Sequence, residues 1–257
     1  MVTSIEHMIS RWHASVYEKT QDAEGCIQLL ETILGDRPLT IFEPGAGTGK
    51  IASALSKKHH TVTGMDVDKE MLFYAEKRAK NATRLRLLNA DLLVAPWPKD
   101  FDAVLIADNL MHNLITDWEY KQAQKQLILK SANSLKKKGL LFLDFDCPLS
   151  LAPYGQAEKL VFEGTDEDGF SGKMYIKGME ADEKTRLVKS KRIYFITTPS
   201  GEALRTEQIT IKHFLTLEET TAWLYRAGFT IEALYGSYKG APFNEENRRC
   251  VILARKE

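Results

Sequence analysis

Three glycines at alternate positions follow a short apolar run in the stretch TIFEPGAGTGK, residues 40–50. Gly45, Gly47 and Gly49 carry no side chain, so a ligand can approach the backbone closely at these positions. Glu43 places a carboxylate beside them. The combination predicts a ligand site with a negative charge next to the glycine turn, although a tight strand-to-helix turn without a ligand gives the same glycine pattern.

Two phosphate-binding loops that use glycines have patterns that this stretch does not match. A P-loop requires a glycine where Pro44 stands and a serine or threonine where Ile51 stands. The dinucleotide fingerprint G-x-G-x-x-G requires its third glycine where Lys50 stands. Phosphate cradling is therefore disfavoured, and binding of NAD by an oxidoreductase is kept as the alternative.

Asp66 is a second acidic residue with a position that could do chemistry. It lies 23 positions after Glu43, at the end of an apolar run. The carboxyl ends of strands in open α/β sheets border the ligand crevice, and two carboxylate oxygens suit the vicinal hydroxyls of a ribose. Capping of the next helix is the other role open to an aspartate here, and we assign that role to Asp68.

The segments that must position these residues alternate between the apolar patterns of strands and of helices. The expected strands are residues 39–44, 60–66, 84–91, 101–108 and 140–145, and the expected helices are residues 50–58, 69–81 and 119–139, the last one closed by Gly139. Such alternation produces right-handed crossovers and a parallel sheet covered on both faces. We therefore expect an α/β fold with a doubly wound, Rossmann-like, mostly parallel sheet.

The pattern changes after residue 148, where segments rich in Ile, Tyr, Phe and Thr predict an antiparallel β insert. Pro199 to Gly201 predict its hairpin turn, and a capping box at Thr216 and Glu219 opens the last helix, which ends at Gly228 and precedes two final strands. The expected domains are an N-terminal helical lid, a ligand-binding core and a capping insert, at residues 1–35, at 36–149 with 215–257, and at 150–214.

The pattern E/D-x-G-x-G-x-G, together with Asp66, resembles the class I S-adenosylmethionine-dependent methyltransferases, and the chain after residue 150 is similar to their small-molecule N- or O-methyltransferase subgroup. The resemblance covers most of the chain and implies S-adenosyl-L-methionine as the cofactor. It implies that Gly45, Ala46 and Gly47 pass under the methionine and ribose parts, and that Glu43 orients the methionine amino group.

The resemblance also assigns cofactor contacts after the later strands. Asp91 in NADLL is expected at the adenine amino group, and the other cofactor contacts that the resemblance implies are Leu92 against the ring, Val67, Met71, Asp108 and Asn109, the last two under the methionine moiety. Tyr17, in a segment similar to the family's N-terminal lid, is expected to close over the cofactor with Trp12, although both aromatic residues could equally anchor the first helix.

The implied reaction is an in-line methyl transfer to a nitrogen or oxygen of a small molecule, and it requires no metal. A general base is required only where the acceptor must lose a proton. His112 is the catalytic candidate, and the other candidate bases are Asp146, His13 and His213, of which His213 fits a buried structural role better. The aromatic candidates for the acceptor pocket are Tyr154, Tyr235 and Tyr238. A non-catalytic nucleoside-binding module is a further alternative.

Composition limits the partners and the location. Thirty-five basic residues balance 35 acidic ones, so there is no net field that would draw the protein to nucleic acid or to a membrane surface. An N/D-P-P-Y/F tetrad of nucleic-acid methyltransferases is absent after the fourth strand. Three scattered cysteines, no signal peptide and no long apolar run predict a cytoplasmic protein with reduced thiols. The sequence does not predict an oligomeric state.

Overall fold

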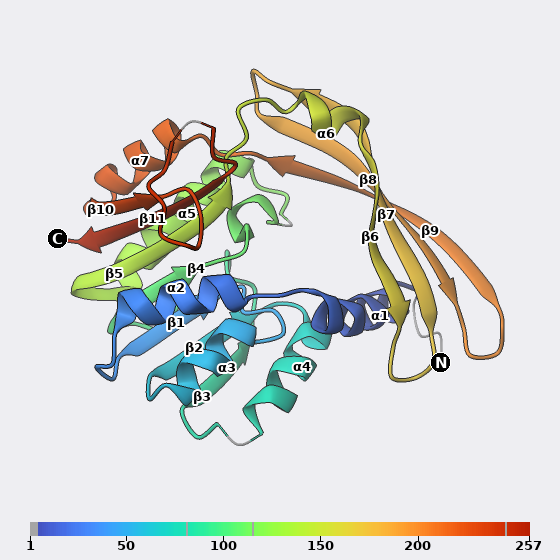
Figure 1. Ribbon diagram of the computed structural model, residues 1–257, viewed down its shortest axis with the longest axis horizontal. Helices are drawn as coiled ribbons and strands as arrows, with labels where there is room; N and C mark the ends of the chain where they lie inside the picture. Colours follow the sequence, from blue (N-terminus) through green and yellow to red (C-terminus); the bar gives the residue numbers. More distant parts are fainter. Residues whose placement is uncertain (1–4, 81, 115, 245) are drawn as a thin grey trace. The chain divides into compact units, whose positions relative to one another are not determined.

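The chain divides into two compact units in the computed structural model, which describes residues 5–80, 82–114, 116–244 and 246–257 (Figure 1). One unit, the insert unit, comprises residues 1–22 and 150–213, and the other, the sheet unit, comprises residues 23–149 and 214–257. The N-terminal segment 1–35 is therefore not one unit. Helix α1 (Ile5–Thr20) packs with the insert, whereas α2 (Glu24–Leu34) packs with the parallel sheet.

A seven-stranded sheet forms the centre of the sheet unit, with the strand order β10-β11-β5-β4-β1-β2-β3. The central strands pair in parallel, whereas β11 pairs antiparallel with both β5 and β10. The strands are β1 (Thr40–Pro44), β2 (Thr61–Asp66), β3 (Leu85–Asn89), β4 (Phe101–Ile106), β5 (Leu135–Asp146), β10 (Phe229–Tyr235) and β11 (Arg249–Lys256). Strands β2 and β3 lie on one side of β1, whereas β4 and the later strands lie on its other side. The strand order therefore reverses between β1 and β4, and this is the switch point where such sheets bind ligands.

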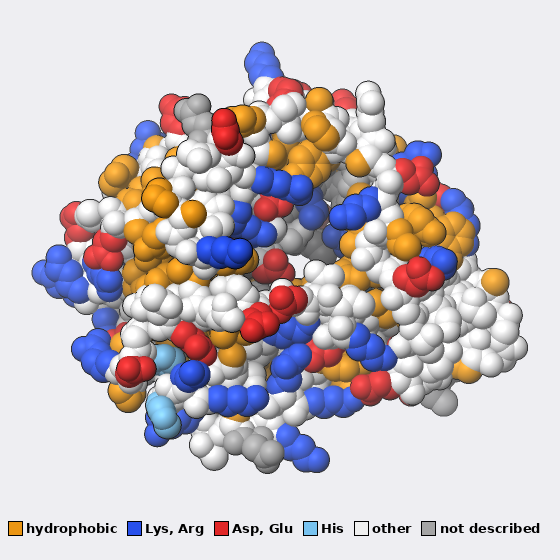
Figure 2. Space-filling model, viewed as in Figure 1, with side chains coloured by type: hydrophobic (Ala, Val, Ile, Leu, Met, Phe, Trp, Pro, Cys, Tyr) orange, Lys and Arg blue, Asp and Glu red, His pale blue; other side chains and the backbone are white. Residues whose placement is uncertain are grey.

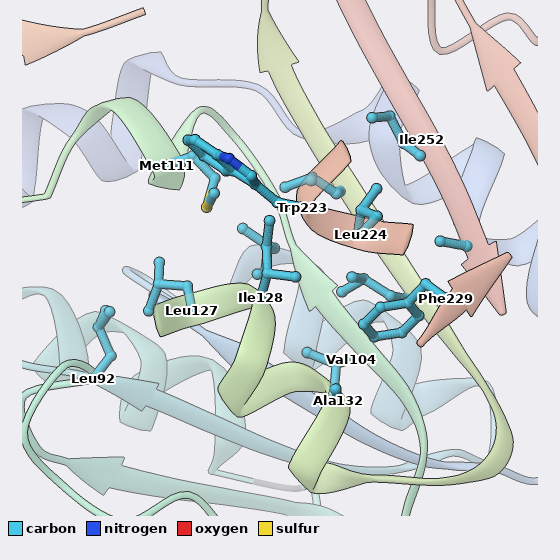
Figure 3. Close-up of a cluster of buried hydrophobic side chains, with 14 of the residues drawn as sticks. Leu92, Val104, Met111, Leu127, Ile128, Ala132, Trp223, Leu224, Phe229 and Ile252 are labelled. Atoms are coloured by element: carbon cyan, nitrogen blue, oxygen red, sulfur yellow. The ribbon is translucent and has the colours of Figure 1, made fainter. Parts of the chain in front are cut away.

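Alternate residues of the central strands enter two separate apolar cores. Phe42 and Val104 join the core that contains helices α5 (Tyr120–Ser134) and α7 (Leu217–Arg226), whose side chains are drawn in Figure 3. Ile41 and Leu105 join the core on the other face, with α2 and α3 (Lys50–Lys57). Helices therefore cover both faces, and the predicted doubly wound α/β fold is confirmed.

The long helix before β5 is shorter than the sequence indicated. It ends at Ser134 rather than at Gly139, because Leu135 already pairs with Phe101 of β4. Lys138 then adopts a positive φ of 63° and shifts the register before the buried part of β5 begins. Three consecutive lysines look like the end of an exposed helix in sequence, and only the pairing with β4 shows that they belong to a strand.

The insert unit contains an antiparallel sheet in the order β6-β7-β8-β9. Its elements are α6 (Ala152–Gln156), β6 (Glu158–Thr165), β7 (Ser171–Asp182), β8 (Leu187–Thr197) and β9 (Ala203–His213). Trp12 of α1 is fully buried against this sheet and donates a hydrogen bond from Nε1 to the carbonyl oxygen of Gly164 at 3.0 Å. The predicted antiparallel insert is confirmed, but strand β6 had not been singled out in the sequence.

Local caps and turns follow the expected residues. The carboxylate of Asp68 caps α4 (Lys69–Ala79) by accepting from the amides of Glu70 and Met71, at 2.9 and 3.3 Å. Thr216 caps α7 through the amide of Glu219. The expected end of α4 at residue 81 lies outside the described residues.

Among the described residues, no helix is long and apolar enough to cross a membrane. Figure 2 shows acidic and basic side chains interspersed over the face in view, consistent with the balanced composition.

Candidate active site at the carboxyl edge of the parallel sheet

The carboxyl ends of the parallel strands meet at one edge of the sheet, which we call the carboxyl edge. Glu43 lies at the end of β1, Asp66 ends β2, and Asp108 follows β4. Asp144 and Asp146 lie at the end of β5. Five carboxyl groups that are far apart in the sequence are thus gathered beside the switch point.

The three glycines of the loop after β1 differ in what a side chain at each position would contact. All three adopt positive φ, at 71°, 54° and 71° for Gly45, Gly47 and Gly49. A Cβ at Gly45 would lie 2.6 Å from the Leu110 side chain, and one at Gly49 would lie 2.8 Å from Ala75. A Cβ at Gly47 would have nothing within 4 Å. Gly45 and Gly49 therefore allow close packing, whereas Gly47 borders open space.

Asp66 holds the glycine loop directly. Its Oδ2 accepts from the amide of Gly47 at 2.8 Å, and its Oδ1 accepts from the amide of Asp68 at 2.9 Å. Burial raises the pKa of Asp66, and the amide hydrogen bonds oppose that shift. Each carboxylate oxygen keeps a second lone pair, so Asp66 can still accept from two ligand hydroxyl groups. Helix capping falls to Asp68, as predicted.

Among the described carboxyl groups of the carboxyl edge, Glu43 has a buried oxygen without a hydrogen-bond partner. Its side chain is only 4% exposed, and its Oε2 has no hydrogen-bond partner among the described residues. Burial, reinforced by the nearby charges of Asp66 and Asp108, raises the pKa of Glu43 to about 8 against an opposing hydrogen bond from the Ala52 backbone. A buried carboxyl oxygen without a partner is costly, so this position favours a ligand that supplies a donor or a positive charge.

The loop after β3 is held by hydrogen bonds from two side chains that the sequence analysis did not identify. Asp91 Oδ1 accepts from the amide of Leu93 at 2.8 Å, while Leu92 is buried. The Leu92 carbonyl oxygen accepts from Trp97 Nε1 and from Lys130 Nζ, both at 2.8 Å. The sequence gives no signal for these contacts, because their acceptor is a backbone carbonyl.

Val67 and Met71, two further residues predicted to contact the cofactor, flank the start of α4. Val67 follows β2 directly and is 59% exposed, which is unusual for a valine at the end of a buried strand. Met71 is half-buried in the first turn of α4. Both side chains are therefore accessible to a ligand.

The turn after β4 has an unusual backbone. Asp108 and Asn109 both adopt the left-handed conformation, at φ 52° and 61°, before the 3-10 helix η1 (Leu110–His112). Aspartate and asparagine tolerate this region better than other residues with a side chain, yet each such residue still costs roughly 1 kcal/mol. Neighbouring groups must therefore hold the turn.

His112 lies at the end of this turn but is buried. Its Nε2 accepts from the amide of Leu215 at 3.3 Å, and its ring lies 4.8 Å from Phe214 and 5.7 Å from Phe145, centroid to centroid. These are contacts of a structural histidine. The catalytic role stays a prediction, with geometry that favours packing.

The other predicted residues are distributed between the two units. Asp146 forms ion pairs with Arg248 and Arg249, at 3.3 and 3.4 Å, so both of its carboxylate oxygens already contact a guanidinium group. Four of the remaining residues belong to the insert unit: His13 and Tyr17 pack on Phe162, His213 is buried at the end of β9, and Tyr154 lies in α6. Tyr235 ends β10 at the carboxyl edge, where it pairs with Val251, the residue of β11 that pairs with Asp144. Tyr238 donates instead to Asp144.

Comparison with known proteins bears on what this edge does. A family model described as a methyltransferase domain matches residues 41–139, which include the glycine loop, Asp66, Asp91 and Asp108. A protein of Geobacillus sp. (strain WCH70), named as a candidate methyltransferase, is 23% identical over 217 residues, or 84% of each chain. A S-adenosylmethionine-dependent methyltransferase from Clostridium acetobutylicum shares the fold with a TM-score of 0.75, at 16% identity over 98% of this chain and 99% of that chain.

Residues 41–139 form a methyltransferase domain. A sugar N-methyltransferase from Streptoalloteichus sp. has the same fold, with a TM-score of 0.69 and 18% identity over 99% of this chain and 93% of that chain. The predicted methyltransferase is confirmed, and it replaces the alternatives of an NAD-dependent oxidoreductase and of a non-catalytic module.

The charges of the carboxyl edge fit the methyltransferase cofactor better than a dinucleotide. S-adenosylmethionine carries a sulfonium and an ammonium group, and the negative charges of Asp66 and Asp108 already disfavour ionisation of Glu43. A cation relieves this repulsion, whereas a pyrophosphate would add to it. The open space at Gly47 and the unpartnered oxygen of Glu43 are features that such a cation-bearing ligand can use.

Proposed function

We propose that this methyltransferase transfers the methyl group of S-adenosylmethionine to a nitrogen of a small molecule, and that the carboxyl edge holds the cofactor. The observation that carries the cofactor assignment is the buried Glu43 oxygen without a partner, beside the open space at Gly47. For the acceptor, the support comes from proteins of the same fold that include a sugar N-methyltransferase, an amino pentose methyltransferase and a glycopeptide N-methyltransferase.

Each residue of the edge has a distinct proposed role. Glu43 pairs with the methionine ammonium group, and Asp66 accepts from the ribose hydroxyls while it holds the loop amide of Gly47. Asp91 accepts from the adenine amino group. The remaining proposed contacts are the backbone of Gly45 and Ala46, the side chains of Val67, Met71 and Leu92 near the adenine, Asp108 and Asn109 near the methionine, and Tyr17 as a lid residue.

The cofactor supplies an activated methyl group on sulfur, so the chain needs to bind, orient and exclude water rather than perform covalent chemistry. A protonated amine acceptor must lose its proton before it can attack. His112 is kept as a candidate for that step, although its Nε2 already accepts from the Leu215 amide. Most amines can also lose this proton to water before they bind, in which case no base is needed.

We further propose that residues 150–214 determine which acceptor is used, that nucleic acid is not the acceptor, and that the protein is cytoplasmic. The support for the last two points is the balanced charge and the three cysteines Cys26, Cys147 and Cys250, none of which forms a disulfide. These sequence features agree with a reducing compartment and a small-molecule acceptor.

A titration and a screen test the proposed function. S-adenosylmethionine and S-adenosylhomocysteine should raise the melting temperature, because a ligand at a hundredfold excess over its Kd stabilises a protein by about 2.7 kcal/mol. NAD should have no effect. Amines, phenols and carboxylates are then incubated with cofactor, and products are identified by mass spectrometry. Methylated amines are the expected products. Stabilisation by NAD alone would overturn the cofactor assignment, and methylation of hydroxyl groups alone would overturn the choice of nitrogen.

A further inference from the structure

The left-handed turn at Asp108 and Asn109 is held by residues from three other segments of the sheet unit. The backbone amide of Asn109 donates to Asp144 Oδ1 at 3.4 Å. Its side-chain Oδ1 accepts from the backbone amide of Asp146 at 2.6 Å. The end of β4 is therefore tied to the end of β5 through both the backbone and the side chain of Asn109.

Asp144 is the centre of this arrangement, and it is completely buried. The hydroxyl of Tyr238 donates to its Oδ2, and Arg249 Nη1 donates to its Oδ1 at 3.0 Å. The guanidinium of Arg249 also lies 5.2 Å from the centroid of the Tyr238 ring. Each oxygen of the carboxylate thus has a fixed donor, so its orientation toward Asn109 is determined.

Arg249 extends the arrangement to the neighbouring carboxylate. Its Nη2 lies 3.4 Å from Asp146 Oδ1, so one guanidinium spans both acidic residues of β5. Arg249 opens β11, and Tyr238 lies in the segment between β10 and β11. A Cβ on Gly25, at the start of α2, would lie 3.5 Å from Tyr238, so this ring is also packed against α2.

This arrangement costs the protein two unfavourable backbone conformations and a buried charge. A fold retains such costs where they preorganise a site, because a turn already in its bound conformation loses less on ligand binding. Asp108 projects from the same turn and is exposed. The turn follows β4 at the switch point, where the proposed cofactor site lies.

We propose that Asp144 is a positioning residue for the cofactor, holding the turn at Asp108 and Asn109 in its binding conformation through hydrogen bonds that Tyr238 and Arg249 keep aligned. The proposal rests on the cofactor site of the proposed function. It predicts that changes to Asp144 and Tyr238 lower cofactor affinity although neither side chain is assigned a contact with the cofactor.

Two variants test the proposal. Tyr238→Phe removes only the hydroxyl donor, and Asp144→Asn keeps the shape of the side chain but removes its charge. Binding of S-adenosylhomocysteine is measured by calorimetry, and the free energy of unfolding is measured in urea. We expect affinity to fall about three- to tenfold in Tyr238→Phe and more than about tenfold in Asp144→Asn, as hydrogen bonds to a charged group imply. The KM for the acceptor should change less than about twofold, because the turn serves the cofactor.

Asp102→Asn provides the matched control. Asp102 is a carboxylate of the same sheet that accepts from the Thr40 amide at 2.8 Å and pairs with Lys136 at 2.9 Å, but it lies at the start of β4 rather than at its end. This variant should lose stability while its affinity for S-adenosylhomocysteine stays unchanged. Equal loss of affinity in Asp102→Asn would overturn the proposal, because the effect would then be general destabilisation.

The outcomes separate this proposal from the proposed function. If the wild-type protein does not bind S-adenosylhomocysteine, the cofactor assignment itself is wrong. If the wild type binds and both variants bind equally well, only the positioning role of Asp144 is wrong. Should Asp144→Asn fail to fold, Tyr238→Phe decides alone, because it leaves every carbon atom of the packing in place.

Discussion

Burial of Glu43 makes the stability of the ligand-free protein depend on pH. The pKa of this carboxyl group rises from an ordinary value of 4.5 to about 8 in the folded protein. The folded state therefore binds the proton more tightly than the unfolded state does between these values. The stability associated with protonated Glu43 is fully present below pH 4.5 and is lost as the pH rises toward about 8.

This linkage gives a direct prediction for cofactor binding. At pH 7 free Glu43 is mostly protonated, and an ammonium group placed beside it favours the carboxylate. Binding of S-adenosylmethionine should therefore release close to one proton, and affinity should increase with pH up to about 8. Calorimetry in two buffers of different ionisation enthalpy measures the released proton. Glu43→Gln should release none, and equal release from both proteins would assign the proton to another group.

Asp66 and Asp68 form a natural pair for comparison. Asp66→Ala removes the acceptor that holds the Gly47 amide and the proposed ribose contacts, so the affinity for S-adenosylmethionine should fall by roughly 1.5 to 3 kcal/mol. Asp68→Ala removes only the cap of α4 and should cost about 1 kcal/mol of stability. Calorimetry and urea unfolding on both variants check the division. Unchanged affinity in Asp66→Ala would reduce Asp66 to a structural residue.

At the residue scale, the sequence indicated the acids at strand ends but not the residues that hold them. Glu43, Asp66 and Asp108 are recognisable because they follow apolar runs. Tyr238 and Arg249 contact Asp144 across 94 and 105 positions of the chain, and no local pattern encodes such pairs. Those contacts appear only when the sheet brings β5 and β11 together.

At the element scale, strands and helices with a strong apolar period were predictable, and weakly patterned ones were not. The central strands β1, β2 and β4 are continuous buried runs. In β6 only Phe162 is buried, so the segment lacks the alternation that would reveal a strand. Its place in the sheet is decided by pairing with β7, which is a tertiary effect.

Helix α5 provides an element-scale prediction through its contact with the loop after β3. Lys130 Nζ donates to the carbonyl oxygens of Leu92 and Ala95, both at 2.8 Å. Lys130→Met should loosen this loop and weaken S-adenosylmethionine binding about three- to tenfold, with a smaller effect on stability. Lys125→Met is the control, since Lys125 lies on the same helix but over the Trp223 ring. Equal affinities in the two variants would show that the loop needs no support from Lys130.

At the scale of the whole molecule, the division into two units predicts a separation of roles. Removing residues 173–214 alone would uncover Trp12, which is buried between α1 and the insert sheet. A better deletion joins residues 23–149 to residues 214–257 through a short flexible linker and so removes the insert unit completely. This protein should bind S-adenosylhomocysteine within about tenfold of the wild-type Kd but methylate no acceptor.

Circular dichroism and urea unfolding establish whether the shortened protein is folded. A folded protein whose affinity for S-adenosylhomocysteine drops by more than about a hundredfold, or roughly 2.7 kcal/mol, would show that the insert unit contributes a principal part of the cofactor site. The predicted lid residue Tyr17 belongs to that unit. If Tyr17 adds only a single contact with the cofactor, the affinity for S-adenosylhomocysteine should fall by less than this.

The central claim, that the open space at Gly47 receives the cofactor, is tested most directly by S-adenosylhomocysteine titrations of Gly47→Val and Gly35→Val. Both glycines have positive φ, at 54° and 65°, and a Cβ at either would meet nothing within 4 Å, so both variants strain the backbone without a clash at Cβ. Gly35 lies at the end of α2, away from the carboxyl edge. We predict that folded Gly47→Val binds at least about a hundredfold more weakly than the wild type while Gly35→Val binds normally. A folded Gly47→Val with the wild-type Kd would contradict the site assignment.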